Sequence, residues 1–229
     1  MAGWHYSGSM CGRYTLAVDA DDLWEEFDLE DGPDDLAPRF NVAPTQRVAA
    51  IADRAPRSLV MLRWGLIPFW AKDPSIGNRM INARAETLAD KPAFRQAFAK
   101  RRCLVLADGF YEWKREGRIK TPVHIRLRSK RPFAFAGLWE SWRDPAGDPI
   151  ESCTIVTTRP SLVIAPIHDR MPAILDRSAR ARWLDPAATR EELTGLLLPF
   201  PSEELDHYVV SRLVNSPAND TPGCVEPVE

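Results

Sequence analysis

The chain has 229 residues, of which 45% are hydrophobic and 27% charged, and this composition excludes collagen-like, disulfide-rich and disordered proteins. Its net charge is -2, no apolar run reaches the ~18 residues of a membrane span, and residues 1–30 contain no apolar signal segment. We therefore expect a cytosolic protein of one domain, or two at most, without membrane contact.

Charge is distributed unevenly along the chain. Residues 14–38 contain ten acidic residues and no Lys or Arg, whereas residues 100–131 contain eleven Lys or Arg and three acidic residues. Such a basic stretch is typical of a surface that binds a polyanion. It is equally typical of solvated strand edges, where lysine and arginine discourage aggregation, so both interpretations stay open.

Local patterns predict short strands and a helix in the first part of the chain. Asp19 is a candidate N-cap, and the helix after it would place Leu23, Trp24 and Phe27 on one face. Two strand-like runs joined by a turn-prone stretch indicate a hairpin. The predicted elements are a strand at 12–16, a helix from Asp19 to near Gly32, hairpin strands at 48–52 and 58–64, and a helix opened by Pro92.

The helix opened by Pro92 ends on Lys100, Arg101 and Arg102, where the helix dipole favours cations. Strand-like runs separated by turn clusters follow, which predicts antiparallel, meander-like pairing. The predicted strands are 103–107, 110–114, 122–127, 133–139, 152–158 and 208–210, and the predicted helices are 177–184 and 190–197. Because helices and strands do not alternate as βαβ units, we expect the α+β class rather than a doubly wound parallel sheet.

The chain divides into three expected segments. Residues 1–10 form an N-terminal extension that resembles a tag or is removed, residues 11–222 form the domain, and residues 223–229 form a flexible, proline-rich tail. Cysteines 11, 103, 153 and 224 form no C-x-x-C pair and the histidines are scattered, so we expect a reducing compartment and no metal site. No glycine-rich phosphate loop occurs, and no organic cofactor is expected. We expect Cys103, Cys153 and Trp139 to lie in the core.

Six stretches of the sequence are more unusual than a core requires. In chain order they are MCGRY at 10–14, FNVAPT at 40–45, RWGLIPFW at 63–70, INARAET at 81–87, DGFYEWK at 108–114 and IHDRMP at 167–172. The set and its order resemble the SRAP (SOS response associated peptidase) family from Met10 to about Pro222. The resemblance implies a single domain built on a curved, mainly antiparallel sheet or open barrel covered by short helices.

Cys11 is the candidate reactive residue. If the chain began there, one residue would carry both a thiol and an α-amine, with reference pKa values of about 8.5 and 8, so both groups would be partly nucleophilic near neutrality. An aldehyde condenses with such an amine to an imine, and the thiol then closes a five-membered thiazolidine. The resemblance implies that Cys11 crosslinks to the ring-opened aldehyde of an abasic site in single-stranded DNA. A lone cysteine is otherwise most often a small buried hydrophobe.

Met1 to Ser9 precede Met10 and depart from the family pattern, because they acylate the amine that this chemistry needs. We expect the active form to begin at Cys11, or self-processing to expose it.

Glu112 and His168 are the candidate proton carriers. Aromatic neighbours in the 110–113 stretch limit the solvation of Glu112 and raise its pKa toward the range useful for proton transfer, although the pattern alone also fits a carboxylate on an outer sheet face. The pKa range of histidine suits the same work, although a lone histidine is more often structural. The resemblance implies that Glu112 shuttles protons and that His168 assists opening of the sugar ring.

Asn82 and Arg84 alternate along a candidate strand and so share one face, although a turn-capping role is equally open. The resemblance implies that Asn82 positions the sugar, that Arg84 holds a flanking phosphate, and that Asn41 helps to orient the site. Arg13 is a second phosphate candidate because it lies close to Cys11, and Arg170 is a further DNA-binding candidate.

Aromatic residues in the loop at 64–70 are candidates for base stacking, which contributes roughly 1 to 3 kcal/mol per base. Trp64, Phe69 and Trp70 are difficult to bury together in a loop broken by glycine and proline, although core packing stays open for Trp64. The resemblance implies that Trp70 and Pro44 wedge against the bases beside the lesion.

The expected function is therefore covalent shielding of abasic sites in single-stranded DNA. The resemblance also implies lyase and self-processing activity, and a protein with this function would be associated with the nucleoid if bacterial. Two other classes of protein function stay open. One is a thiol peptidase with Cys11 and His168 as a dyad, and the other is a non-catalytic module that binds nucleic acid or protein.

Overall fold

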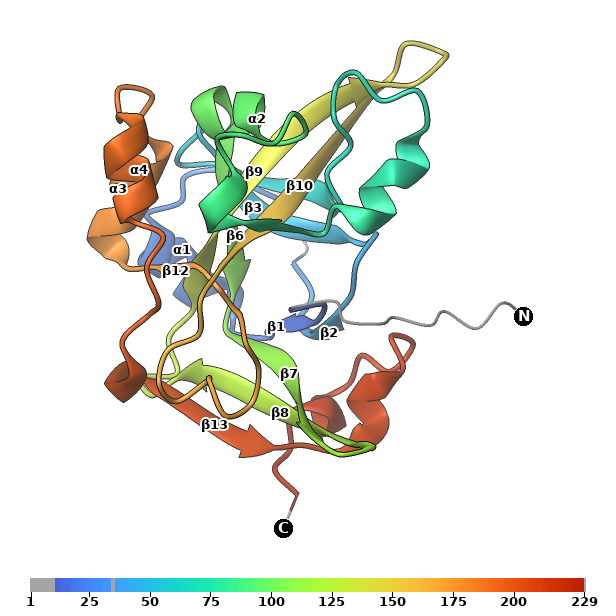
Figure 1. Ribbon diagram of the computed structural model, residues 1–229, viewed down its shortest axis with the longest axis vertical. Helices are drawn as coiled ribbons and strands as arrows, with labels where there is room; N and C mark the ends of the chain where they lie inside the picture. Colours follow the sequence, from blue (N-terminus) through green and yellow to red (C-terminus); the bar gives the residue numbers. More distant parts are fainter. Residues whose placement is uncertain (1–10, 34–35, 229) are drawn as a thin grey trace.

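The computed structural model describes residues 11–33 and 36–228 (Figure 1). The N-terminal extension expected at 1–10 lies outside these residues. The described chain forms two β-sheets in contact, with short helices on the outside (Figure 1). None of the helices in the described part of the chain combines the length and apolar character of a membrane-spanning segment.

Within the described residues, five strands close into a barrel. They are β3 (Arg47–Ala52), β4 (Leu59–Trp64), β6 (Arg102–Ala107), β9 (Phe133–Arg143) and β10 (Pro149–Thr158). The order is β10-β4-β3-β6-β9, and the ring closes because β9 also pairs with β10. All of these pairs are antiparallel except β10 with β4. The short strands β5 (Asn82–Arg84), β11 (Met171–Pro172) and β12 (Ile174–Leu175) extend this sheet.

The second sheet is antiparallel and lies against one end of the barrel (Figure 1). Its order is β13-β8-β7-β1-β2, and its strands are β1 (Tyr14–Leu16), β2 (Arg39–Val42), β7 (Gly109–Glu116), β8 (Ile119–Leu127) and β13 (Leu205–Val209). Tyr14 joins the two sheets, since its ring centroid lies 5.4 Å from that of Trp64 in β4 and 5.8 Å from that of Phe135 in β9. The start of β1 is thereby anchored to the barrel.

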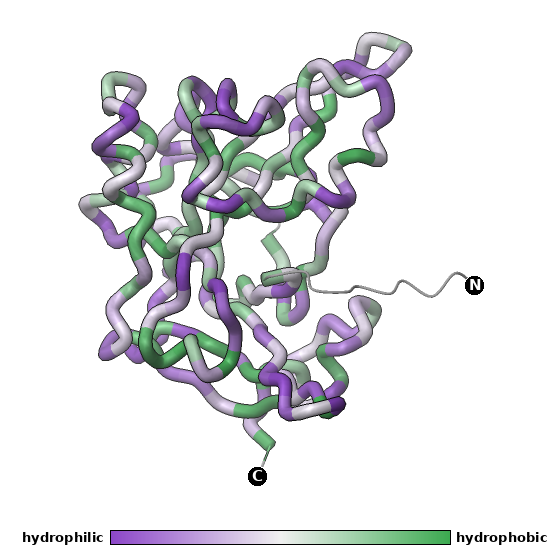
Figure 2. The backbone as a smooth tube through the Cα atoms, in the orientation of Figure 1, coloured by the Kyte–Doolittle hydropathy of each residue, from purple (hydrophilic) through white to green (hydrophobic). Residues whose placement is uncertain are grey.

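The core fills the barrel because its strands present apolar side chains inward. Every residue of β6 is buried, as are most residues of β9 and β10. Figure 2 shows hydrophobic residues along the strands at the centre of the molecule. Cys103 and Cys153 are fully buried and Trp139 is 8% exposed, which confirms their expected place in the core.

Short helices lie against the barrel and against the second sheet (Figure 1). They are the α-helices α1 (Ala20–Phe27), α2 (Arg95–Lys100), α3 (Arg177–Leu184) and α4 (Arg190–Gly195), and the 3-10 helices η1 (Pro74–Arg79), η2 (Ala85–Thr87), η3 (Ser202–Glu204), η4 (Arg212–Asn215) and η5 (Pro222–Cys224). Arg102, which begins β6, is 1% exposed and donates to the carbonyls of Phe98, Ala99, Trp183 and Asp185. Its cation thus stabilises the C-terminal ends of α2 and α3, as the helix dipole favours.

The expected α+β fold is confirmed, with differences in detail. The first helix ends at Phe27 instead of near Gly32, because Asp28 adopts a left-handed conformation with a φ of 51°. Strand β2 was not predicted, and the predicted meander is interrupted because β6 and β7 belong to different sheets. The expected flexible tail includes Cys224, which is fully buried and whose carbonyl accepts from the Tyr111 hydroxyl at 3.3 Å. This part of the tail is packed because it covers the outer face of the second sheet.

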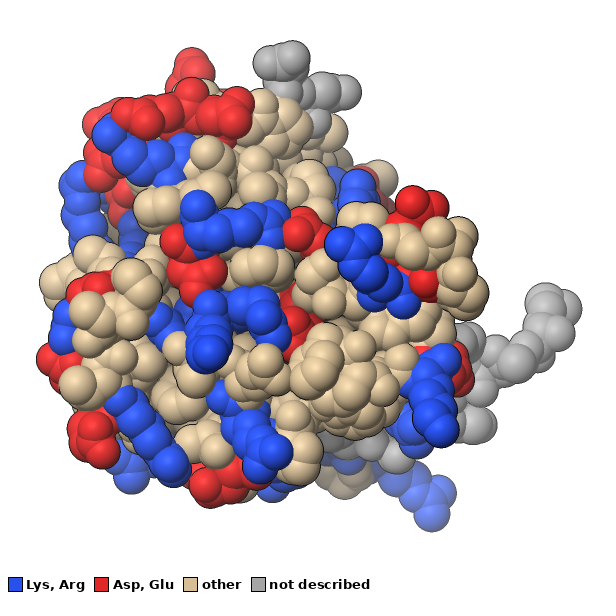
Figure 3. Space-filling view, turned by 90° about the horizontal axis from the view of Figure 1, so that it is seen from above, with Lys and Arg blue, Asp and Glu red and all other residues tan. Residues whose placement is uncertain are grey.

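Four of the eleven basic residues at 100–131 form ion pairs with acidic side chains. Arg101 contacts Glu140 at 2.6 Å, and Arg131 contacts Glu26 at 2.5 Å. On the face shown in Figure 3, basic and acidic side chains are interspersed, and acidic side chains gather toward the upper left. These ion pairs favour a solvated surface for the paired part of the stretch, and both interpretations stay open for its other basic residues.

Candidate active site

The pairing of β1 with β7 brings Cys11 beside Glu112. Tyr14 is opposite Phe110, and the Tyr111 amide donates to the Arg13 carbonyl at 3.0 Å, so the chain before β1 continues alongside β7. The Cys11 backbone nitrogen then donates to Glu112 Oε1 at 2.8 Å. A carboxyl group therefore lies against the nitrogen that becomes the α-amine in a chain that begins at Cys11.

Glu112 is 2% exposed, and this burial raises its pKa to about 8. The hydrogen bond from the Cys11 N–H acts in the opposite direction, and the nearby charge of Asp169 adds to the rise in the pKa. A carboxyl group with a pKa near neutrality can both donate and accept a proton. The sequence-based expectation of a raised Glu112 pKa agrees with this direction.

Cys11 is fully buried and has a φ of 25°, which residues other than glycine adopt rarely. Burial, and secondarily the charge of Glu112, raises the pKa of its thiol well above the usual value. The sulfur is therefore a protonated thiol near neutrality and must lose its proton to a neighbouring base as it reacts.

His168 lies on the other side of Glu112, in the loop between β10 and β11. Its Nε2 is 3.9 Å from Glu112 Oε2. Its Nδ1 is 3.1 Å from the Arg170 backbone nitrogen and 3.1 Å from Asp169 Oδ1. In the neutral ring Nδ1 accepts from the Arg170 N–H, which leaves the proton on Nε2, facing Glu112; in the imidazolium form Nδ1 donates to Asp169.

Asn82 completes the group of expected catalytic residues. It begins β5, which pairs in parallel with β10 so that Asn82 is opposite Ile155. Its Nδ2 donates to the Cys11 carbonyl at 3.3 Å. Ala83 is buried and Arg84 exposed, as strand alternation predicts. Residues distant in sequence, Cys11, Asn82, Glu112 and His168, are thus brought to one place.

The residues expected to bind DNA divide into exposed and internal ones. Phe69 is 50% exposed and Trp70 is 48% exposed, Arg84 is exposed and Pro44 is half-buried, so all four are accessible to a ligand. Trp64 is fully buried, and its Nε1 donates to the Ile81 carbonyl at 2.8 Å. The prediction that Trp64 contacts bases is therefore wrong for this structure, because Trp64 fills the barrel.

Asn41 and Arg13 have structural contacts that the sequence did not reveal. Asn41 is fully buried and its amide donates to the carbonyls of Val214, Ser216 and Asn219, so a direct contact between Asn41 and DNA is excluded in this structure. Arg13 donates to Asn41 Oδ1 at 3.0 Å and to the carbonyls of Val214 and Asn215. Together they hold the C-terminal segment beside the start of β1.

Arg170 is already engaged by an acidic partner. Its guanidinium donates to both oxygens of Glu86, at 2.5 and 2.8 Å, and to the Thr157 carbonyl at 2.7 Å. A phosphate can reach Arg170 only by sharing or replacing Glu86.

Two acidic residues near the site were not singled out in the sequence. Asp169 faces His168, and its only sequence signal is that it follows His168 directly. Asp108 accepts hydrogen bonds from the Thr15 hydroxyl and from the Ala17 N–H at 2.7 Å, and so connects the start of β7 to the end of β1.

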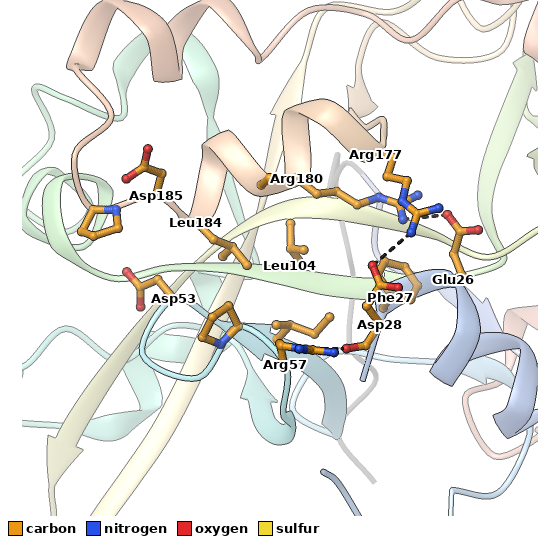
Figure 4. A pocket seen from close by; sticks show the side chains of 14 residues that line it. Glu26, Phe27, Asp28, Asp53, Arg57, Leu104, Arg177, Arg180, Leu184 and Asp185 are labelled. Atoms are coloured by element: carbon orange, nitrogen blue, oxygen red, sulfur yellow. Dashed lines mark hydrogen bonds and ion pairs between the residues drawn. The ribbon is translucent and has the colours of Figure 1, made fainter. Parts of the chain in front are cut away.

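A separate cavity of about 670 Å³ lies between α1, α3 and the barrel (Figure 4). None of its lining residues belongs to the group around Cys11. Its charged groups pair with one another: Arg180 contacts Glu26 at 2.8 Å and Arg177 contacts Asp28 at 3.0 Å (Figure 4). In the described chain, no cluster of three or more His, Cys, Asp or Glu side chains is placed to hold a metal ion.

Comparison with known proteins shows to which family this chain belongs. The sequence profile of the SOS response associated peptidase (SRAP) family matches residues 10–217. The chain belongs to the SRAP family. The SRAP resemblance inferred from the six stretches is thereby confirmed.

Similar SRAP relatives are known from bacteria and vertebrates. The abasic site processing protein YoqW of Bacillus subtilis is 47% identical over 222 residues, covering 95% of this chain and 99% of that protein. The abasic site processing protein HMCES of Gallus gallus is 38% identical over 204 residues, covering 78% of this chain and 60% of that protein. A crystal structure of a Bacteroides thetaiotaomicron protein has a TM-score of 0.87 at 29% identity, covering 96% of this chain and 100% of that one.

Proposed function

We propose that this SRAP protein processes abasic sites in DNA by covalent attachment through Cys11. The observation that carries the proposal is the 2.8 Å contact between the Cys11 nitrogen and the buried Glu112 carboxyl group. This contact places a group that can carry a proton next to the nitrogen that would attack an aldehyde. The names of similar proteins, abasic site processing proteins, agree with this chemistry.

The first step is imine formation by a chain that begins at Cys11. The amine adds to the C1' aldehyde of the ring-opened sugar, and the resulting carbinolamine loses water as its hydroxyl is protonated. Glu112, whose buried carboxyl group lies 2.8 Å from this nitrogen, supplies this proton. Water leaves with the aldehyde oxygen, and a C=N bond remains.

The second step closes the ring. The Cys11 sulfur adds to the imine carbon and forms a C–S bond. The C=N double bond becomes a C–N single bond, and the nitrogen takes up a proton. The thiol proton leaves to Glu112, now ionised, which His168 Nε2–H faces at 3.9 Å. Because sulfur and nitrogen belong to one residue, the closure is intramolecular and favoured by high effective molarity. The product is a thiazolidine.

DNA contacts come from the exposed residues around this centre. Phe69 and Trp70 present about half of their surface to solvent, and exposed rings stack on unpaired bases. Arg84 follows Asn82 by two residues, is itself exposed, and supplies a cation for a flanking phosphate. These features favour single-stranded DNA as the substrate.

The test is denaturing gel electrophoresis after mixing the protein with an oligonucleotide whose uracil has been removed enzymatically. Protein that begins at Cys11 forms one adduct per chain that survives boiling in detergent, with a mass equal to the sum of both partners less one water. The matched control is protein whose intact mass shows that residues 1–10 are still attached; it forms none, because its Cys11 nitrogen is an amide. Cys11→Ala, in the chain that begins at residue 11, also forms none.

Absence of an adduct from the chain that begins at Cys11 would overturn the proposal. If Cys11→Ser left DNA protection intact, a non-catalytic binding module would be favoured. Turnover of unrelated peptides by Cys11 and His168 would favour a thiol peptidase.

A second activity, self-processing, is favoured by the same contact. Glu112 lies on the nitrogen of the bond between residues 10 and 11, which is where a leaving amine needs a proton when water adds to the carbonyl and the C–N bond breaks. Intact mass of the protein made in its own cell should correspond to a chain beginning at Cys11. The Glu112→Gln variant should retain the preceding residues, and a processed Glu112→Gln chain would contradict this role.

Lyase activity follows from the imine. The C=N bond at C1' acidifies the hydrogens on C2', and removal of one of them expels the 3' phosphate by β-elimination. Strand breakage in the gel described above, dependent on an unblocked Cys11, measures this reaction.

A further inference from the structure

The exposed aromatic pair Phe69 and Trp70 lies at the tip of a turn whose other residues are buried. Leu66, Ile67 and Pro68 before the pair are buried, and Ala71 after it is 9% exposed. The Ala71 N–H donates to the Pro68 carbonyl at 2.9 Å and closes the turn. Two large apolar rings are thus held outward by a short segment that is otherwise inside the protein.

Side chains from the β9–β10 hairpin fix the two ends of this turn. Ser152 in β10 is fully buried, and its Oγ accepts from the Ile67 N–H at 2.8 Å. Trp142 in β9 is 6% exposed, and its Nε1 donates to the Ala71 carbonyl at 2.7 Å. One hydrogen bond therefore holds the residue two positions before the aromatic pair, and the other holds the residue directly after it.

An apolar cluster also holds the two ends of this turn in place. It consists of Ile67, Ala71, Trp142, Ile76 and Ile150 and is separate from the main barrel core. Within it, Trp142 contacts the turn from the hairpin side, and Ile150 is the β10 residue directly opposite Trp142. The cluster has no member among Cys11, Asn82, Glu112 and His168.

We infer that Trp142 and Ser152 are positioning residues that hold Phe69 and Trp70 ready to stack on unpaired bases. The inference rests on the proposed function only for its ligand, single-stranded DNA. A side chain that is already ordered loses little conformational freedom when it binds, so rigid anchoring of the turn increases affinity without any contact between the anchors and DNA.

The test measures binding of an intact single-stranded oligonucleotide, which has no abasic site, separately from adduct formation. Trp142→Phe removes the N–H donor to Ala71, and Ser152→Ala removes the acceptor for Ile67 with a minimal change in volume. Each is expected to weaken binding by roughly three- to tenfold. The salt dependence of binding and the rate of adduct formation at saturating abasic oligonucleotide should both stay unchanged, because these variants leave the cations and the reacting groups intact.

Trp139→Phe is the matched control. Trp139 lies in the same strand, and its Nε1 donates to Asp53 at 2.9 Å, so the variant loses an equivalent hydrogen bond away from the turn. Its oligonucleotide affinity should equal that of the wild type. In a protein carrying Phe69→Ala and Trp70→Ala, Trp142→Phe should cause no further loss of affinity, because the anchor acts through these rings.

Three results would overturn the inference: wild-type affinity in both anchor variants, the same loss in Trp139→Phe, or a full additional loss in the protein that lacks both rings. A failure of the proposed chemistry gives a different pattern. In that case no adduct forms with any variant, while the affinities for intact oligonucleotide still differ between Trp142→Phe and Trp139→Phe.

Discussion

At Glu112, two opposing influences act on one carboxyl group. Burial favours its neutral form, whereas the hydrogen bond from the Cys11 N–H favours the carboxylate, and burial dominates, so that the pKa is raised to about 8. In the proposed mechanism, this carboxyl group is the acid when the carbinolamine loses water and the base when the thiol loses its proton. A pKa near neutrality suits one residue to both steps.

This raised pKa makes stability depend on pH. Below about pH 4.3 the carboxyl group is protonated in both the folded and the unfolded chain; between about 4.3 and 8 only the unfolded chain ionises it, so the free energy of unfolding falls as the pH rises. Glu112→Gln removes this decline, which amounts to a few kcal/mol at about 1.4 kcal/mol per pH unit. Urea denaturation of the full chain at pH 5 and pH 8 measures the effect.

Glu116→Gln is the control for this measurement, because Glu116 ends the same strand but is exposed. The free energy of unfolding of Glu116→Gln should differ from that of the wild type by nearly the same amount at both pH values. If the free energy of unfolding of Glu112→Gln also differed from the wild-type value by the same amount at pH 5 and pH 8, the Glu112 carboxyl group would titrate normally and would not be the proton carrier.

At the level of elements, the C-terminal segment is held to the second sheet by one carboxylate. Asp220 accepts from the backbone N–H groups of Phe40 and Asn41, at 2.6 and 2.9 Å, and from Arg39 Nε at 2.5 Å. This segment also supplies the carbonyls that hold Asn41 and Arg13. The position of the chain just after Cys11 thus depends on residues that follow it by about two hundred positions.

Asp220→Ala leaves these N–H groups without their acceptor and should lower the free energy of unfolding by about 2 kcal/mol. Adduct formation should slow as well, since Arg13 loses its fixed surroundings. Denaturation curves and adduct kinetics measure the two effects. Asp148→Ala, in the exposed turn between β9 and β10, is the control and should change neither; equal stability of both variants would contradict the role of Asp220.

At the scale of the whole molecule, the face shown in Figure 3 carries charges of both signs, and the exposed rings of Phe69 and Trp70 are available for stacking. Affinity for DNA should therefore depend on few phosphate contacts. The logarithm of the binding constant should fall with the logarithm of the salt concentration by about 0.7 for each phosphate that is neutralised.

Arg84→Ala should reduce this slope by about 0.7, because one exposed cation is lost. Phe69→Ala should weaken binding without changing the slope, since stacking releases no counterions. Titration of an intact single-stranded oligonucleotide at several salt concentrations distinguishes the two variants. A binding constant independent of salt would contradict any phosphate contact by Arg84.

Most of the strands could be predicted from the sequence, because alternation and turn residues are local signals. Their assembly could not: β6 and β7 are neighbours in the chain yet belong to different sheets, and nothing local indicates that β10 pairs in parallel with β4. Trp64 was misassigned for the same reason, since alternation does not tell which face of a strand looks into a barrel.

The site residues were suggested by the resemblance to SRAP proteins and partly by their chemistry. Spacing alone gave no reason to bring Cys11, Asn82 and His168 together, because their proximity depends on long-range pairing between strands. The positive charge of Arg170 suggested that it binds a phosphate, but the sequence did not show that it pairs with Glu86. This bidentate pairing forms only when the loop between β10 and β11 folds against η2. The sequence likewise did not show that the Asn41 amide donates to backbone carbonyls.

The pairing of β5 with β10 also has a consequence for synthesis on the ribosome. Within the described chain, the strand that carries Asn82 pairs with β10, some seventy residues later, and His168 follows β10. A nascent polypeptide therefore exposes its cysteine long before the groups that act on it have emerged. The group around Cys11 can therefore assemble only after the segment that carries His168 has left the ribosome.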